Sequence, residues 1–232
     1  MDFLNSVAVD DLHDLYNTDM AGTSGGITRS GSSGSYEYVA IPGRENMPVN
    51  YVSFYDALRF ANWLHNRQLD GIQNAITTED GAYTITAQGT AQNTITRMPG
   101  AMIFLPSEDE WYKAAYYDPG TSQYNLYPTG STSTTCTQPP PSPVPNTANC
   151  ATADLSDAGA YASSESPYGT FDQGGNVREW NEAVVSTTQR GVRGGSFLSD
   201  VSALESGSAE SLDPAIEVSD VGFRVATWSG CL

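Results

Sequence analysis

The segment Gly169–Trp180, which reads GTFDQGGNVREW, says most about how this chain folds. It places two carboxylates, Asp172 and Glu179, on either side of a Gly-Gly pair. Glycine permits tight turns that other residues resist, and carboxylate and carbonyl oxygens are the ligands that Ca²⁺ prefers. The segment therefore predicts a tight turn that wraps oxygen atoms around a hard cation.

The bulk composition indicates one loop-rich α+β domain. At 232 residues the chain can bury a sizeable core. It holds 22 glycines, and helix-like periodicity is confined to a few segments. Neither an internal repeat nor a break in composition divides it. We expect a single domain over residues 1–232, with two main helices and short antiparallel strands.

The charge balance limits the possible partners. The formal net charge is −17, from 27 acidic and 10 basic residues, so the surface should repel phosphate backbones and exclude nucleic-acid binding. A solvated surface or cation binding would each explain the acidity. No run approaches the roughly 20 apolar residues that a membrane span requires.

Two helix starts carry capping signals. Ser53 is followed three residues later by Asp56, and Ser107 is followed by Glu110, an arrangement typical of capping boxes. Residues 2–16 show roughly helical spacing of apolar residues, and 77–86 read as a hairpin around Asp80-Gly81. We also expect a short strand over residues 36–40.

Three cysteines are present. Cys136 and Cys150 flank a Pro-rich loop, and a disulfide between them would contribute about 3 kcal/mol; two free thiols are the alternative. We expect Cys231 to be free or to form an intermolecular bond.

Six motifs occur in an order that resembles the formylglycine-generating enzyme family, also called sulfatase-modifying factors. The family's blocks correspond here to Pro48–Ser53, Leu105–Trp111, Tyr127–Gly130, Gly175–Trp180, Arg193–Phe197 and Gly222–Ala226. The resemblance covers nearly the whole chain. It implies a compact domain similar to C-type lectins that binds one or two calcium ions.

The resemblance also implies particular calcium ligands. One site would use the side chains of Asp172 and Glu179 with the carbonyls of Gly175 and Val177. The alternative is that Glu179 forms a salt bridge with Arg178 or Arg193.

The resemblance implies a second site at Asn149 and the carbonyl of Cys150. An acidic partner would come from Asp154 or Asp157.

The sequence departs from the catalytic members of the family. Those members carry two copper-binding cysteines just after the Gly-Gly-Ser block, and the matching positions here are Ser199 and Leu204. Soft thiolates are what copper(I) requires, so we expect no copper and no formylglycine oxidase activity. His13 and His65 are not at metal-ligand spacing, and we assign no catalytic residue.

In this family the segment before the closing Gly-Phe-Arg motif forms the exposed, ligand-facing surface. Here that segment is Ser199–Asp220, which is small, acidic and free of aromatic residues. Its candidate ligand-binding residues are Ser199, Asp200, Ser202, Glu205, Ser208 and Glu210.

From the resemblance we expect the family's first strand to be missing from this sequence. It also shows no signal peptide. Calcium sites and a possible disulfide nevertheless favour an extracellular or cell-surface location.

The leading hypothesis is a non-catalytic, calcium-stabilised binding or assembly module whose partner is a protein, a glycan or another copy of the chain. Three alternatives stay open. They are an enzyme that uses a different site, a self-assembling surface or filament protein, and a variable binding protein diversified by a retroelement.

Overall fold

The computed structural model describes residues 1–228. The four α-helices of this part are α1 (Asp2–Val7), α2 (Phe54–His65), α3 (Ala87–Gln92) and α4 (Glu108–Tyr116), and two 3₁₀ turns are η1 (Thr18–Ala21) and η2 (Val201–Leu204). The longest two helices are α2 and α4, as expected. No helix among the described residues has the length and apolar character needed to cross a membrane.

The strands are short and form separate small sheets. The pairs are β1 (Ile27–Ser30) with β2 (Glu37–Ala40), β3 (Ile103–Phe104) with β10 (Ala226–Thr227), and β4 (Tyr117–Asp118) with β5 (Gln123–Tyr124). A four-stranded sheet has the order β8 (Glu210–Leu212), β7 (Gln189–Arg193), β6 (Arg178–Ser186) and β9 (Val221–Phe223). All these pairs are antiparallel except β6 with β9, which is parallel and departs from the expectation.

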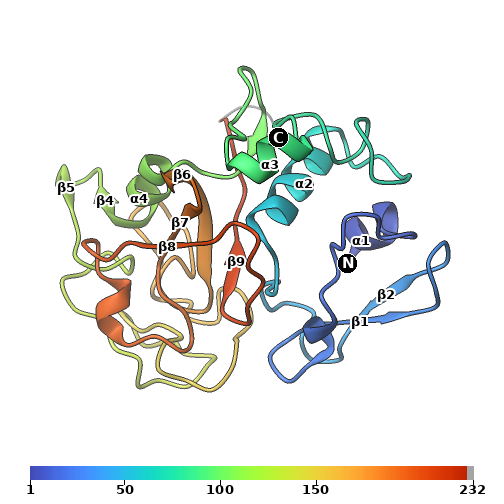
Figure 1. The fold of residues 1–232 in the computed structure, drawn as a ribbon. Coiled ribbons are helices and arrows are strands. Elements are labelled where there is room, and N and C mark those ends of the chain that lie inside the picture. Colours follow the sequence, from blue (N-terminus) through green and yellow to red (C-terminus); the bar gives the residue numbers. More distant parts are fainter. Residues whose placement is uncertain (229–232) are drawn as a thin grey trace.

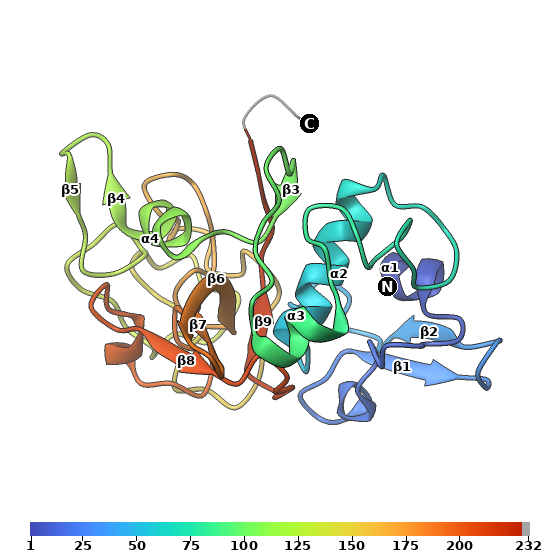
Figure 2. The same cartoon turned by 45° about the horizontal axis from the view of Figure 1, so that its top comes forward.

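Helix α2 lies between two groups of elements (Figure 1). The four-stranded sheet, α4 and the β4–β5 hairpin lie on one side, and α1 with the β1–β2 hairpin lies on the other, as the rotated view shows most clearly (Figure 2). In the sequence, the N-terminal group and α2 come before the strands of the four-stranded sheet.

Both main helices begin with the predicted capping boxes. The Ser53 hydroxyl accepts from the Asp56 N–H, and the Asp56 carboxylate accepts from the Ser53 N–H. Ser107 and Glu110 form the same reciprocal pair in α4. These bonds satisfy backbone donors that a helix start leaves unpaired.

The core has two main parts that meet at Phe223. One part packs α2 against the sheet around the fully buried Trp180, and the other packs α1 and the N-terminal segment around Trp63. The rings of Phe60 in α2 and Phe223 in β9 lie edge-to-face with centroids 5.3 Å apart. Their contact joins both parts of the core, which fits a single cooperative unit.

Two local expectations were wrong. The N-terminal helix covers Asp2–Val7 only, and residues 77–86 form no hairpin. In that segment the Asn62 side chain donates to the carbonyls of Thr78 and Tyr83 and accepts from the Tyr83 N–H. A buried amide from α2 thus takes the hydrogen bonds that a paired strand would have supplied.

Candidate functional site

The turn that precedes β6 is fixed by backbone bonds to two distant segments. The Gly175 N–H donates to the Gly194 carbonyl at 2.9 Å, and the Asn176 N–H donates to the Asn149 carbonyl at 2.8 Å. Gly175 has a φ of +83°, and a Cβ there would lie 2.4 Å from the Asn149 carbonyl oxygen. The second glycine of the motif is therefore required by a close approach of two backbones.

Glu179 points into the protein and is 4% exposed. Its Oε2 accepts from the indole N–H of Trp111 at 2.6 Å and from Nε of Arg224 at 2.5 Å. Its Oε1 accepts from Nη2 of Arg224 at 2.5 Å. Arg224, from the closing Gly-Phe-Arg motif, is therefore the counter-ion of this buried carboxylate.

The arginines considered from the sequence have other partners. Arg178 pairs with Asp220 and Glu210, and Arg193 pairs with Glu108. The expected partners of Glu179, Arg178 or Arg193, were therefore wrong, and the arginine that pairs with Glu179 is Arg224, 45 residues further along the chain.

Asp172 lies beside this pair. With Glu179 and Arg224 it lines a cavity of about 390 Å³, whose apolar wall includes Phe171 and Phe223. Its Oδ2 accepts from the Gly159 N–H at 2.7 Å. Burial raises the pKa of the Asp172 carboxyl, the Gly159 bond and the Arg224 charge oppose that rise, and the Glu179 charge adds to it. The turn thus brings both predicted carboxylates to one cavity.

The second predicted calcium position is also occupied by protein contacts. Asp154 accepts two bonds of 2.8 Å from Arg44, which lower the pKa of its carboxyl. The Asn149 amide donates to the Asp154 carbonyl, and its oxygen accepts from the Thr152 hydroxyl. Cys150 is fully buried next to this loop, in a disulfide with Cys136. That pairing confirms the disulfide, while Cys231 lies outside the described residues.

As arranged here, the predicted ligands do not fit calcium. Both oxygens of Glu179 accept hydrogen bonds from Trp111 and Arg224, and the Asp154 carboxylate is neutralised by Arg44. Calcium needs six to eight oxygen ligands with unshared lone pairs. Within residues 1–228 no group of three or more His, Cys, Asp or Glu side chains could hold a metal. Calcium at either position stays a prediction that requires an arginine to leave its carboxylate.

The predicted binding segment is exposed at some positions and anchored at others. Asp200, Ser202 and Glu210 are exposed, and Glu210 forms a surface salt bridge with Arg178. The remaining predicted residues are partly buried. Glu205 accepts from the Tyr127 hydroxyl at 3.0 Å, and the Ser208 carbonyl accepts from Arg193. The segment therefore offers three exposed polar side chains on a fixed backbone, of which Glu210 is already paired with Arg178.

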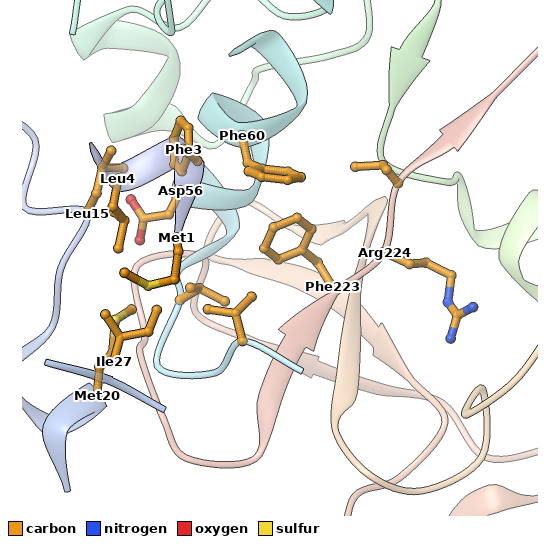
Figure 3. A pocket seen from close by; sticks show the side chains of 13 residues that line it. Met1, Phe3, Leu4, Leu15, Met20, Ile27, Asp56, Phe60, Phe223 and Arg224 are labelled. Carbon is orange, nitrogen blue, oxygen red and sulfur yellow. The ribbon is translucent and has the colours of Figure 1, made fainter. Parts of the chain in front are cut away.

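An apolar cavity of about 370 Å³ lies where α1, β1 and α2 face β9 (Figure 3). Phe3, Phe60 and Phe223 contribute rings to it, and the Arg224 side chain points away from these rings. The Arg224 guanidinium donates to Glu179 instead. Asp56 contributes a carboxyl group to the lining of this cavity, and burial raises the pKa of that carboxyl to about 7. The sequence assigned Asp56 only to helix capping.

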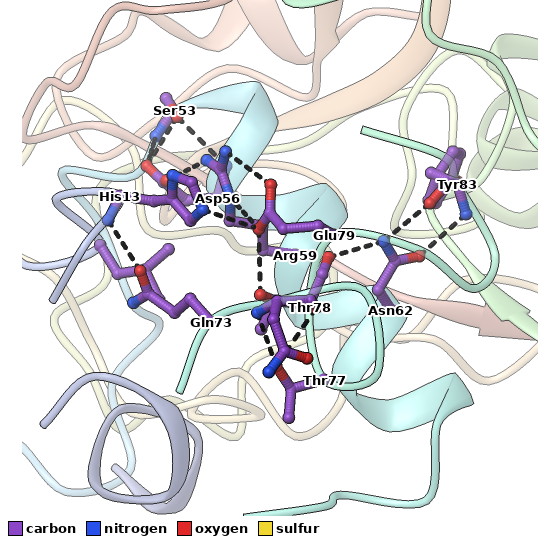
Figure 4. A network of polar contacts seen from close by, with 12 residues as sticks. His13, Ser53, Asp56, Arg59, Asn62, Gln73, Thr77, Thr78, Glu79 and Tyr83 are labelled. Carbon is purple, nitrogen blue, oxygen red and sulfur yellow. Dashed lines mark hydrogen bonds and ion pairs between the residues drawn. The ribbon is translucent and has the colours of Figure 1, made fainter. Parts of the chain in front are cut away.

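A polar network ties α2 to the N-terminal segment (Figure 4). Asp56 accepts from the Ser53 hydroxyl at 2.6 Å, and Arg59 lies 3.5 Å from Asp56 and donates to Glu79 at 2.8 Å. His13 reaches Glu79 at 3.5 Å. Through these contacts His13 links the N-terminal segment to Glu79.

Comparisons with known proteins show the family to which this fold and its motifs belong. A family model described as "Sulfatase-modifying factor enzyme 1-like domain" matches residues 7–228. The chain belongs to this family. Among curated protein sequences none matches significantly.

Solved structures share the sulfatase-modifying-factor-like fold. Treponema denticola variable protein 1 has a TM-score of 0.51 and 19% identity, over 81% of this chain and 74% of that one. CarF has a TM-score of 0.50 and 21% identity, over 89% and 77%. PvdO from Pseudomonas aeruginosa has a TM-score of 0.45 and 16% identity, over 86% and 67%. At 19% and 21% identity the first two structures show the fold alone, and nothing is concluded from PvdO, whose TM-score is below 0.5.

Ser199 and Leu204, which the resemblance led us to expect at the positions of the cysteine pair, have structural roles here. The Ser199 hydroxyl accepts from the Ser196 N–H at 2.9 Å and lies 3.2 Å from the Ser196 hydroxyl. Leu204 is fully buried against Tyr127, Ala148 and Cys150. Neither side chain presents a soft ligand.

Reasoning from sequence missed three residues that shape the candidate site. They are Arg224, Arg44 and Trp111, which neutralise or hydrogen-bond the predicted carboxylates. The signal for Arg224 was present, because the Gly-Phe-Arg motif accompanies the Glu-Trp motif in the same family pattern. Arg44 has no such signal in a sequence taken alone.

Proposed function

We propose that this chain is a non-catalytic sulfatase-modifying-factor-like domain that binds a protein or glycan through the segment Ser199–Asp220. The carrying observation is the burial of Leu204, which fills one of the two cysteine positions with core packing. Copper(I) oxidase chemistry depends on thiolates, so the scaffold is retained without the groups that define the family's oxidation reaction.

The exposed side chains of the segment support a binding role. Asp200, Ser202 and Glu210 make no contribution to the core. Their backbone is anchored, because the Leu204 carbonyl accepts from the Tyr116 hydroxyl and the Ser206 N–H donates to the Leu126 carbonyl. A fixed backbone with free polar side chains lowers the entropy cost of binding.

The disulfide supports placing the domain outside the cytosol. Cys136 and Cys150 are joined across the Pro-rich loop. Such bonds persist in secreted and surface proteins, because cytosolic thiols are kept reduced. We therefore propose an extracellular or cell-surface role.

The catalytic part of the proposal has a direct test. The purified chain is incubated with a sulfatase peptide, copper, oxygen and a thiol reductant, and the peptide is analysed by mass spectrometry. We expect unmodified cysteine. Formylglycine in the peptide, in excess of a reaction without the chain, would overturn the proposal.

The binding part has a separate test. Labelled chain is applied to arrays of surface proteins and glycans, beside an Asp200→Ala/Ser202→Ala/Glu210→Ala variant. The matched control, Asp2→Ala/Ser32→Ala/Glu37→Ala, changes the same exposed residue types on the N-terminal side. We expect specific binding by the native chain and the control only. Equal binding by all three proteins, or none by any, contradicts the proposal.

A further inference from the structure

Four tyrosines from three segments form a cluster on the side of α4 and the β4–β5 hairpin. Tyr117 and Tyr124 pair across the hairpin with ring centroids 5.0 Å apart, and Tyr112 of α4 lies 5.1 Å from Tyr124. Tyr168 comes from a separate loop and stacks on Tyr117 at 6.5 Å with an interplanar angle of 24°. We call these residues the tyrosine cluster.

Two rings of the cluster are exposed and the other two are half-buried, although aromatic rings usually dominate cores. Tyr124 is 52% exposed and Tyr168 is 47% exposed. The β4–β5 hairpin has two cross-strand residue pairs, and one of them, Tyr117 with Tyr124, is an aromatic pair that stabilises it. Tyr168 takes no part in this pairing. The exposed Tyr168 ring therefore calls for a reason beyond the stability of the hairpin.

The backbone holds Tyr168 firmly in position. The Ser166 N–H donates to the Thr170 carbonyl at 2.8 Å, and the two side-chain hydroxyls lie 2.7 Å apart. These contacts close the loop around Tyr168. The Tyr168 N–H also donates to the Ser166 hydroxyl. In the hairpin, Asp118 accepts from the Gly120 N–H and from the Thr121 hydroxyl. Both ring-bearing turns are thus pre-organised.

We propose that the tyrosine cluster binds an uncharged glycan. One face of a pyranose ring presents C–H groups, which pack on the electron-rich face of an aromatic ring, and its edge presents hydroxyls. Thr121, Ser122 and Gln123 lie exposed beside the rings and supply neutral donors and acceptors for those hydroxyls. The net charge of −17 disfavours sulfated or uronic-acid glycans, and the two cations at the cluster, Lys113 and Arg193, already lie over the Tyr117 and Tyr112 rings.

This inference rests on the proposed binding function and names its ligand class. The tyrosine cluster and the segment Ser199–Asp220 share one framework. The Tyr116 hydroxyl, next to Tyr117 in the chain, donates to the Leu204 carbonyl, and Arg193 lies 5.2 Å from the Tyr112 ring. Helix α4 therefore contacts both the tyrosine cluster and the framework of this segment.

The test titrates the chain with cellohexaose, maltohexaose, mannohexaose and chitohexaose, and with a heparin hexasaccharide, by isothermal calorimetry. We expect at least one neutral hexasaccharide to bind more tightly than heparin. Tyr124→Ala and Tyr168→Ala should each weaken binding about tenfold, and Tyr168→Phe should keep most of it because the ring remains. Tyr36→Ala, a partly buried tyrosine on the β1–β2 side, is the matched control with unchanged affinity.

Circular dichroism of each variant separates lost binding from lost folding, and Tyr168 lies outside any helix or strand. The proposal is overturned if no neutral hexasaccharide binds at millimolar concentration, if heparin binds best, or if Tyr168→Ala binds as the native chain does. The proposed function would still stand if this glycan test failed while the sulfatase peptide stayed unmodified and the chain bound a protein specifically.

Discussion

Arg224 holds a carboxylate that is 5% exposed at its side chain, whereas Arg44 holds one that is 43% exposed. Removing one partner of a buried pair leaves an uncompensated charge, and an exposed pair contributes little. We expect Arg224→Gln to lower the free energy of unfolding by about 3 kcal/mol and Arg44→Gln to lower it by about 1 kcal/mol. Urea denaturation measures both. Equal losses would mean that Glu179 finds another partner.

Asp56 makes stability depend on pH. Its folded pKa is raised to about 7 by burial, with Glu217 adding to the rise and Ser53 and Arg59 opposing it. A carboxyl group whose pKa is raised by folding contributes its full stabilisation at pH values below its unfolded pKa of about 4. This stabilisation of the folded state is lost as the pH rises through the folded pKa of about 7. Asn cannot ionise, so the Asp56→Asn variant does not show this loss. Between pH 4 and pH 8 its free energy of unfolding should rise, relative to that of the native chain, by on the order of 2–4 kcal/mol.

Thermal denaturation at a series of pH values measures this difference. Asp109→Asn is the control, since it alters an exposed carboxylate in the first turn of the other main helix. A difference between native chain and Asp56→Asn that stays constant with pH would refute the assignment.

At the scale of elements, the turn Asp172–Glu179 decides how stability responds to calcium. Arg224 already neutralises Glu179, so we expect the melting temperature in EGTA to equal that in millimolar calcium within about 1 °C. In Arg224→Gln the carboxylate oxygens lose that partner, and calcium should then raise the melting temperature. A clear rise for the native chain would show that the metal displaces Arg224.

Elements whose signals are local were predictable from the sequence. Both capping boxes depend on residues three positions apart, and both helices begin where Ser53 and Ser107 indicate. The disulfide followed from two cysteines flanking one loop. Contacts between distant segments were not predictable. Asn62 replaces a hairpin at residues 77–86, and Arg224 reaches Glu179 across the sheet.

The candidate site shows the same division. The turn geometry at Gly175 followed from the glycine pair, and the chain brings Asp172 and Glu179 to one cavity as the motif suggested. The charge balance inside that cavity depends on which arginine enters it. The sequence named Arg178 and Arg193 as candidates by proximity, and packing brings Arg224 to Glu179 instead.

For the whole molecule, the Phe60–Phe223 contact predicts one cooperative unfolding transition. It joins the core around Trp63 to the core around Trp180. We expect calorimetric and van't Hoff enthalpies to agree for the native chain. Phe223→Ala should separate the transition into two or lower the enthalpy ratio, whereas Phe171→Ala, which lines the Glu179 cavity, should not. Two transitions in the native chain would contradict the single-domain expectation.

Buried anchors alternate with free positions between Ser199 and Asp220, which makes the domain a scaffold for directed selection. Leu204 and Pro214 are buried, whereas Asp200, Ser202 and Glu210 are exposed. A display library randomised at the exposed positions, with the anchors retained, should consist mostly of folded members. Recognition could then be changed without rebuilding the core.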